Sequence, residues 1–276
     1  IGKKYLIAII IATTLISIFA YPYLSYDVFN YMFDAKILTV YHANPYTHKP
    51  LDFPSDDWLR FMRWIHRYSP YGPAWLLMSV VPSLLGLGKF VITLFNFKVL
   101  MAAFHLLNCL IIYKILFKLN PKNQMLGTSF YALNPLVLIE GVVNAHNDVV
   151  LATFILLPVY LLSNQKPLLS ILANIIGTLV KYIPAISLPW LIIEFFSNKP
   201  NLKRYLVLNL ISLALFTFIF SSFKVAVPFI SSGSTQIQFQ PWYLFWTLPL
   251  VAVIVDIRLM ILATSICVGA SLRYLP

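Results

Sequence analysis

Long runs of apolar residues dominate the chain, and short polar segments separate them. The runs cover residues 5–20, 90–117, 125–143, 149–163, 168–181, 183–196, 205–221, 243–255 and 259–275. They do not alternate apolar with polar residues, and hydrocarbon offers the backbone no water to bond with, so they predict helices. We expect the apolar segment 73–88 to be re-entrant, because a full span there would invert the later topology. The pattern therefore predicts an all-α integral membrane protein, a multi-span helical bundle of about nine to ten membrane segments.

Composition and charge support this interpretation. Of the 276 residues 60% are hydrophobic and 11% are charged, whereas soluble domains have about one quarter charged residues. The basic residues behind the net charge of +11 lie at the ends of apolar runs, where cytoplasmic loops gather Lys and Arg. They do not form one soluble basic face, so we expect no nucleic-acid partner. These positions are Lys3, Lys4, Lys114, Lys118, Lys122, Lys166, Lys199, Lys203 and Arg204.

The chain is expected to form one transmembrane domain over residues 1–276, with an external loop at 21–72, because no internal repeat divides it. It begins at Ile1 without a methionine and its last apolar run stops at Pro276, so we expect truncation at both ends. Cys109 and Cys267 lie inside apolar runs. They predict core residues, not a disulfide framework or a thiol metal site.

The alternating topology brings four polar segments to the non-cytoplasmic side: 21–71, 144–148, 181–182 and 221–242. The first contains five of the nine acidic residues. A long ordered loop of this kind is more often functional than a passive connector. We therefore expect the chemistry where these segments meet.

The loop begins with an expected amphipathic helix, YDVFNYMFDAKILTVY at 26–41, which lies at the membrane surface with a polar stripe. Asp27, Asn30, Tyr31 and Asp34 share one helical face. Asp27 and Asp34 are then roughly 10 Å apart along the axis, too far to share a proton or chelate one ion. Asp27 directly follows the first span, which makes it the candidate general base. The alternative is an aspartate that favours the helix dipole.

A second amphipathic helix is expected over DDWLRFMRWIHRY at 56–68. It places Arg60, Arg63 and Arg67 at helical spacing. These arginines are candidates for contact with lipid headgroups.

Three later segments add polar side chains between apolar runs. In NAHND, His146 is a candidate site residue, while Asn147 or Asp148 could instead N-cap the next helix. Lys181 in LVKYIP either snorkels or holds a phosphate. The segment FQPWYLFW supplies aromatic side chains that form an interfacial belt or stack on a sugar ring. It contains Gln240, Trp242, Tyr243 and Trp246.

Familiar catalytic motifs do not occur. The sequence contains no P-loop, GxSxG, HExxH or CxxC pattern, so nucleotide hydrolysis and zinc proteolysis lack their usual markers.

The serial order of motifs resembles a known family. The motifs SYDVFNYMFDAK, ANPYTH, YSPYGPAW, GLGKF, ALNPLVLIEGVVNAHND, LVKYIPAISLP and QPWYLFW follow one another along the chain. In this order they resemble the type C (GT-C) glycosyltransferases, nearest to the polyprenyl-phosphate-mannose-dependent mannosyltransferases of lipoglycan and glycolipid assembly. The resemblance implies a catalytic aspartate in the first external loop, here Asp27, and a lipid-linked sugar phosphate as donor. Related enzymes often have two neighbouring acids there, whereas the next acid here is Asp34, which leaves a divalent cation open.

Together with the resemblance, these residues predict an inverting transfer of a sugar, expected to be mannose, to a lipid or glycan acceptor. Asp27 would remove the acceptor proton, and Lys181 would hold the charge of the departing polyprenyl phosphate. Membrane lipid is the third expected partner, and the expected location is the external face of the cell membrane. The alternatives are a transporter or flippase of a lipid-linked sugar and a non-catalytic subunit. The expected substrate-binding residues are Asn30, Asp34, Tyr71, His146, Asn147, Asp148, Lys181, Tyr182, Gln240, Trp242 and Tyr243.

Overall fold

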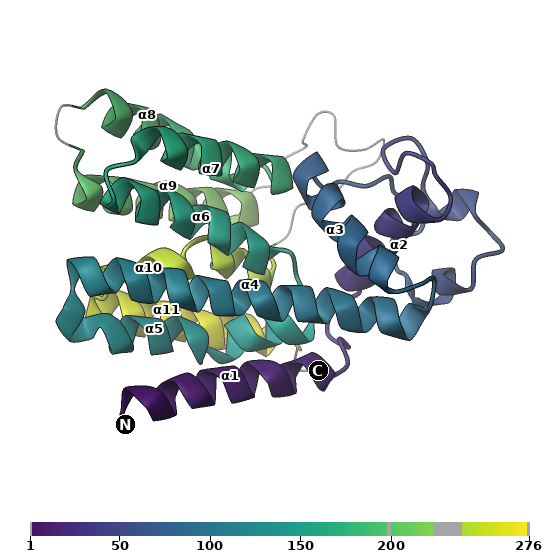
Figure 1. Cartoon of the computed structure of the whole chain (residues 1–276), viewed down its shortest axis with the longest axis horizontal. Coiled ribbons are helices and arrows are strands. Elements are labelled where there is room, and N and C mark those ends of the chain that lie inside the picture. The colour runs from purple at the N-terminus through teal and green to yellow at the C-terminus, as the bar shows by residue number, and fades with distance from the viewer. Residues whose placement is uncertain (1, 198–199, 223–238, 275–276) are drawn as a thin grey trace.

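The computed structural model describes residues 2–197, 200–222 and 239–274, and every regular element in these ranges is helical (Figure 1). Three parts of the sequence predictions lie outside the described residues: the basic residue Lys199, positions 223–238 of the polar segment 221–242, and residues 275–276 at the end of the last apolar run. The α-helices are α1 Lys3–Phe19, α2 Asp27–Thr39, α3 Pro73–Leu85, α4 Phe90–Leu119, α5 Gln124–Ala132, α6 Asp148–Ser163, α7 Pro167–Val180, α8 Leu188–Phe196, α9 Leu202–Ser222, α10 Leu248–Ile254 and α11 Ile257–Ser271. A π-helix covers Val137–Val143, and short 3₁₀ helices cover Pro50–Asp52, Asp57–Phe61, Pro121–Asn123, Ile183–Ser187, Pro241–Trp246 and Leu272–Tyr274.

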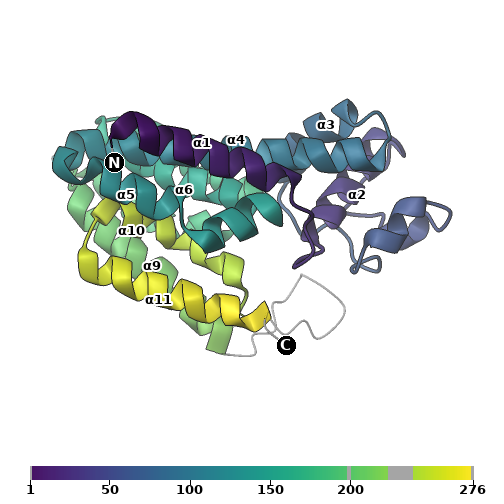
Figure 2. The ribbon, with the colours of Figure 1, turned by 90° about the horizontal axis from the view of Figure 1, so that it is seen from below.

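The helices divide into a bundle and a cap. Helices α1 and α4 to α11 lie side by side, while α2, α3 and the segments around them cover one end (Figures 1 and 2). Helix α4 has 30 residues, about 45 Å, and extends from the bundle into the cap. There Phe90, at its first turn, stacks on Phe29 of α2 and on Phe61, with ring centroids 5.8 and 4.1 Å apart. One long helix therefore fixes the cap on the bundle.

The helical membrane protein is confirmed, but nine to ten full spans are not supported. By length and composition three helices can cross a membrane: Phe90–Leu119, Leu202–Ile219 and Ile257–Tyr274. A fourth span results if Pro121–Ala132 and Val137–Val143, bent by 58°, count as one. Other expected runs become shorter helices of 10–17 residues. Proline explains two of the breaks, because Pro135 follows the end of α5 and Pro184 lies in the 3₁₀ turn before α8.

Charge is distributed unequally between the two ends of the bundle. The turns that join α4 to α5, α6 to α7 and α10 to α11, the end of α8 and the start of α9 lie at the same end as the start of α1 (Figures 1 and 2). These turns and the helix ends beside them carry about half of the Lys and Arg residues but only two of the nine acids, Glu194 and Asp256. Glu194 pairs with Arg204 (2.8 Å), and Asp256 accepts hydrogen bonds from the first turn of α11.

The cap corrects two expectations. Helix α2 forms where expected, but every residue from Val28 to Ala35 is buried, so α2 is a core helix of the cap and not a surface helix. The prediction of a second amphipathic helix over 56–68 is wrong, because only Asp57–Phe61 is helical there and that turn is a 3₁₀ helix. Beyond it Arg67 and Arg63 lie over the ring of Trp64, 4.2 and 5.1 Å from its centroid. These local contacts replace the expected helical spacing.

Candidate active site

Polar side chains meet where the cap covers the bundle. The first turn of α2, the turn between the π-helix and α6, the end of α7 and the 3₁₀ helix Pro241–Trp246 converge there. The turn is made by Ala145, whose φ of 55° is left-handed, and by the bond from His146 N to Glu140 O (3.0 Å). A non-glycine residue in this region is strained, and such strain is frequent at functional sites.

The cluster contains a buried imidazole between two carboxylates. His146 Nδ1 lies 3.5 Å from Asp27 Oδ2, and His146 Nε2 lies 3.4 Å from Glu140 Oε2. Both distances are longer than ordinary hydrogen bonds. The side chains of His146 and Glu140 are 0% and 1% exposed, whereas that of Asp27 is 21% exposed. Asp27 is thus the member of this group that a substrate can reach.

Neighbouring side chains fix the orientation of this group. The ring of His146 stacks on Trp242, with centroids 3.9 Å apart and planes inclined by 21°. Glu140 accepts hydrogen bonds from the Tyr274 hydroxyl (2.6 Å) and from Asn144 Nδ2 (2.9 Å). The imidazole is therefore held in place from its face, and its carboxylate partner is held by two donors.

A second ionic group lies two residues further along the chain. Lys181 Nζ contacts the two carboxylate oxygens of Asp148 at 2.8 and 3.0 Å, and Trp246 Nε1 donates to Asp148 Oδ1 at 2.8 Å. Asp148 is fully buried, while the Lys181 side chain is 22% exposed. An ammonium has three donors, so Lys181 keeps one N–H for a ligand after binding the carboxylate.

Two tyrosines connect the cap to the turn. The Tyr31 hydroxyl donates to Asn147 Oδ1 (3.3 Å), and Tyr71 packs edge-on against the Tyr31 ring, 4.9 Å between centroids. Burial, with a further contribution from the nearby carboxylate of Asp27, raises the pKa of both phenols well above the usual range. Both therefore remain protonated hydrogen-bond donors at neutral pH.

The chain matches the model of a known protein family. The MptA_B family model, described as alpha-(1->6)-mannopyranosyltransferase, N-terminal domain, matches residues 2–197. The chain belongs to this mannosyltransferase family. The match confirms the mannosyltransferase resemblance of the ordered motifs, and it includes Asp27, His146, Asp148 and Lys181. No curated protein and no solved structure matches the chain.

Four expected substrate-binding residues of this mannosyltransferase have surroundings other than the Asp27, His146 and Glu140 side chains. Asn30 Nδ2 contacts Trp64 O at 3.5 Å, inside the cap. Asp34 is 2% exposed, and burial raises its pKa to about 7. Tyr182 is 60% exposed, and the Gln240 main-chain oxygen accepts from Tyr243 N (3.0 Å). Asp34 is thus a core carboxyl of the cap.

The other expected residues of the mannosyltransferase lie within the cluster, as do some that the sequence did not single out. The ring of Tyr243 stacks on Trp246, with 4.4 Å between the ring centroids. Lys181 Nζ lies 6.0 Å from the centroid of the Tyr243 ring. Asn147 is the N-cap residue of α6, but its side chain makes no capping hydrogen bond. Glu140 was missed, although a lone carboxylate in the apolar run VLIEGVV is the signal of an intramembrane functional residue.

Metal binding stays an expectation. In the described ranges no group of three or more His, Cys, Asp or Glu side chains is placed to hold a metal ion. The Asp27 and Glu140 carboxylates lie on opposite nitrogens of one imidazole, an arrangement that holds a histidine.

Proposed function

We propose that the chain transfers mannose from a polyprenyl-phosphate donor to a hydroxyl of a glycan or glycolipid acceptor, with inversion, at the non-cytoplasmic face of the cell membrane. Family membership supports the mannosyl transfer. The observation that carries the mechanism is that Asp27 is part-exposed while the neighbouring Glu140 and Asp148 are buried. A general base must touch the hydroxyl from which it takes a proton, and only an exposed carboxylate can do so.

The proposed reaction has one chemical step. Asp27 takes the proton of the acceptor hydroxyl, its oxygen bonds to the anomeric carbon, and the bond from that carbon to the polyprenyl phosphate breaks. Phosphate is a good leaving group, so no general acid is required. The remaining N–H of Lys181 binds the departing phosphate, and Asp148 with Trp246 orients that ammonium. His146 is fully buried and positions Asp27 without touching the acceptor.

The test is Asp27→Asn in membranes that contain the full chain. Asn has nearly the same shape but cannot accept a proton at neutral pH, so we expect mannose transfer from polyprenyl-phosphate mannose to fall by about 10²- to 10⁴-fold. The fall should appear in kcat, because donor binding depends on other groups. Other polyprenyl-phosphate sugars and a nucleotide sugar, offered in parallel, test the donor class.

The matched control is Asp34→Asn. It makes the same substitution two helical turns along α2, at a carboxyl with a pKa of about 7 that is buried in the cap. We expect nearly normal transfer. If Asp27→Asn keeps normal transfer, Asp27 is not the base, and the transporter and subunit interpretations take precedence.

A further inference from the structure

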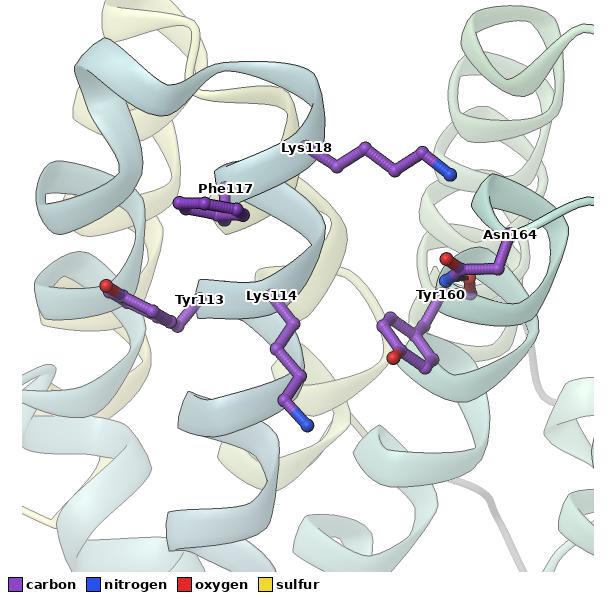
Figure 3. Close-up of a pocket in the computed structure, with 6 residues that line it drawn as sticks. All are labelled: Tyr113, Lys114, Phe117, Lys118, Tyr160 and Asn164. Carbon is purple, nitrogen blue, oxygen red and sulfur yellow. Dashed lines mark hydrogen bonds between the residues drawn. The ribbon is translucent and has the colours of Figure 1, made fainter.

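A hollow of about 490 Å³ lies between the last turns of α4 and α6, at the opposite end of α6 from Asp148 (Figure 3). The side chains of Lys114 and Lys118 extend from α4 toward α6, where Tyr160 and Asn164 lie. Its lining consists of Tyr113, Lys114, Phe117, Lys118, Tyr160 and Asn164.

The hollow follows from how the two helices pack. Nearer the Asp27 end, Asn108 joins them, because its Nδ2 donates to Val149 O (2.8 Å) and its Oδ1 accepts from Thr153 (2.6 Å). Toward the other end the long side chains of Lys114, Lys118 and Tyr160 line the hollow between the helices. Lys118 Nζ there donates to Ser163 O, across the gap.

The positive charge at this hollow has no carboxylate partner on the helices that carry it. Lys3 of α1 adds a third ammonium, which donates to the Tyr113 hydroxyl and lies 4.5 Å from its ring centroid. The sequence has no acidic residue in 1–26, 58–139 or 149–193, so α1, α4 and α6 after its first residue contain none. That first residue, Asp148, is about 24 Å away along α6.

The acids of neighbouring elements at this end are also engaged. Glu194 pairs with Arg204, and Asp256 binds the first turn of α11. Among the described residues no carboxylate pairs with these lysines, so their charge is available to an anion from outside the chain.

The outer face of α4 indicates what kind of anion this is. Leu107, Leu110, Lys114 and Phe117 follow one another at helical spacing on one face. The three apolar side chains are 39%, 47% and 65% exposed. An apolar stripe that leads up to ammonium groups matches an acyl chain below a charged headgroup, a pattern that a free ion does not need.

We propose that this hollow binds the phosphate headgroup of an anionic glycerophospholipid, with Lys114 and Lys118 on the phosphate and an acyl chain along Leu107 and Leu110. Basic hollows between membrane helices bind such headgroups. The site lies at the other end of the bundle from Asp27, so it does not depend on the proposed transfer reaction.

The test titrates the purified full chain in detergent with phosphatidylglycerol and with phosphatidylcholine of the same acyl chains, and measures bound lipid by native mass spectrometry. Phosphatidylglycerol should bind at least about tenfold more tightly. The double substitution Lys114→Gln with Lys118→Gln should weaken the binding of phosphatidylglycerol by on the order of 25-fold, about fivefold for each headgroup-bound lysine. The single substitution Lys114→Gln leaves the contact of Lys118 with Ser163 in place, and should lower the affinity for phosphatidylglycerol by about fivefold.

Two variants control for net charge. Lys122→Gln with Lys203→Gln removes the same charge from exposed lysines outside the hollow, and should change the affinity by less than about twofold. Lys114→Arg with Lys118→Arg should retain binding. Equal affinity for the two lipids would overturn the proposal. An equal loss of phosphatidylglycerol affinity in the Lys114/Lys118 variant and in the Lys122/Lys203 variant would overturn it as well. Competition by inorganic phosphate at concentrations equal to the lipid would show a free-anion site and overturn the lipid assignment.

Discussion

Asp34 shows how burial changes the role of a charged residue. It is on the polar stripe that the sequence shares with Asp27, yet it is enclosed in the cap and burial raises its pKa to about 7. A carboxyl in such a site favours its protonated form, because desolvation disfavours the charge. Two aspartates seven residues apart on one helix thus have different chemistry.

The first prediction concerns the pH dependence of stability. The pKa of Asp34 is about 7 in the fold and about 3.9 in an unfolded chain, so the folded state binds more protons between these values. Its contribution to stability is therefore full below about pH 4 and is lost as the pH rises through 7. Thermal unfolding in detergent from pH 4.5 to 8 should show the native chain losing stability relative to Asp34→Asn. A constant difference between the two would contradict the buried carboxyl.

The sequence predicted the helix around Asp27 and Asp34 but not its surroundings. Periodicity shows which residues share a face, and the apolar residues of α2 fixed its length. It does not show that another layer covers the polar face, because the covering residues, Tyr71 and Asn147 among them, come from distant parts of the chain. That information is tertiary.

At the scale of elements, the π-helix Val137–Val143 is the part of the site that the sequence concealed. It presents Glu140 to His146 and leads into the left-handed turn at Ala145. π-Helical turns are frequent at functional sites. The limits of the apolar runs were predicted well, since Lys, Pro and Asn mark them, but the breaks inside the runs depend on such local geometry.

The second prediction tests whether Glu140 and His146 position Asp27. Glu140→Gln keeps the shape of the side chain but removes the charge beside the imidazole, so kcat should fall by up to about 100-fold with KM little changed. A displacement of roughly 1 Å at a reacting group can cost this much. Steady-state kinetics at several pH values would measure the effect, because a positioning role also alters the pH profile.

Tyr274→Phe is the control for Glu140→Gln. It removes one donor to Glu140 (2.6 Å) but leaves the carboxylate and His146, so its defect should be smaller. Loss of folded protein without a change in kcat per folded molecule would show that Glu140 is structural only.

The third prediction concerns the contact between the cap and α7. Gly72 N donates to Val180 O (3.2 Å), and a Cβ on Gly72 would lie 2.0 Å from the main-chain oxygen of Leu179. Backbone cannot yield as a flexible side chain does, so Gly72→Ala should lower stability by about 1–3 kcal/mol. Thermal unfolding measures this.

Gly269→Ala makes the same substitution in α11, where a Cβ meets nothing within 4 Å. It should instead stabilise the chain by up to about 1 kcal/mol, because Ala favours a helix over Gly. Equal effects at the two positions would mean that the cap does not pack on α7 as described.

At the scale of the whole molecule, the unequal charge of the two ends predicts an orientation of the bundle in the membrane. The end whose short turns carry Lys and Arg with only two acids should face the cytoplasm, which leaves Asp27 and the cap outside. The sequence alone makes the same prediction, from the Lys and Arg clusters at the ends of the apolar runs. It overestimated the full spans, because composition does not show where an apolar run is broken.

The fourth prediction tests that orientation with cysteines introduced at Ser55 and Asn201. Both positions are exposed, and the native Cys109 and Cys267 are buried, so background labelling should be low. A membrane-impermeant thiol reagent added from outside should label Ser55→Cys and spare Asn201→Cys until the membrane is permeabilised. The reverse pattern would place the Asp27 cluster in the cytoplasm.

The buried position of α2 also has a consequence for the order of synthesis. Tyr31 leaves the ribosome 116 residues before Asn147, with which it bonds, and at 5–20 residues per second this takes about 6 to 23 s. Throughout that interval the nascent α2 has neither the turn before α6 nor the end of α7 to cover it. The segment that carries Asp27 is therefore made early and completed late, and a ribosome that stalls before residue 147 leaves it exposed to chaperones and proteases.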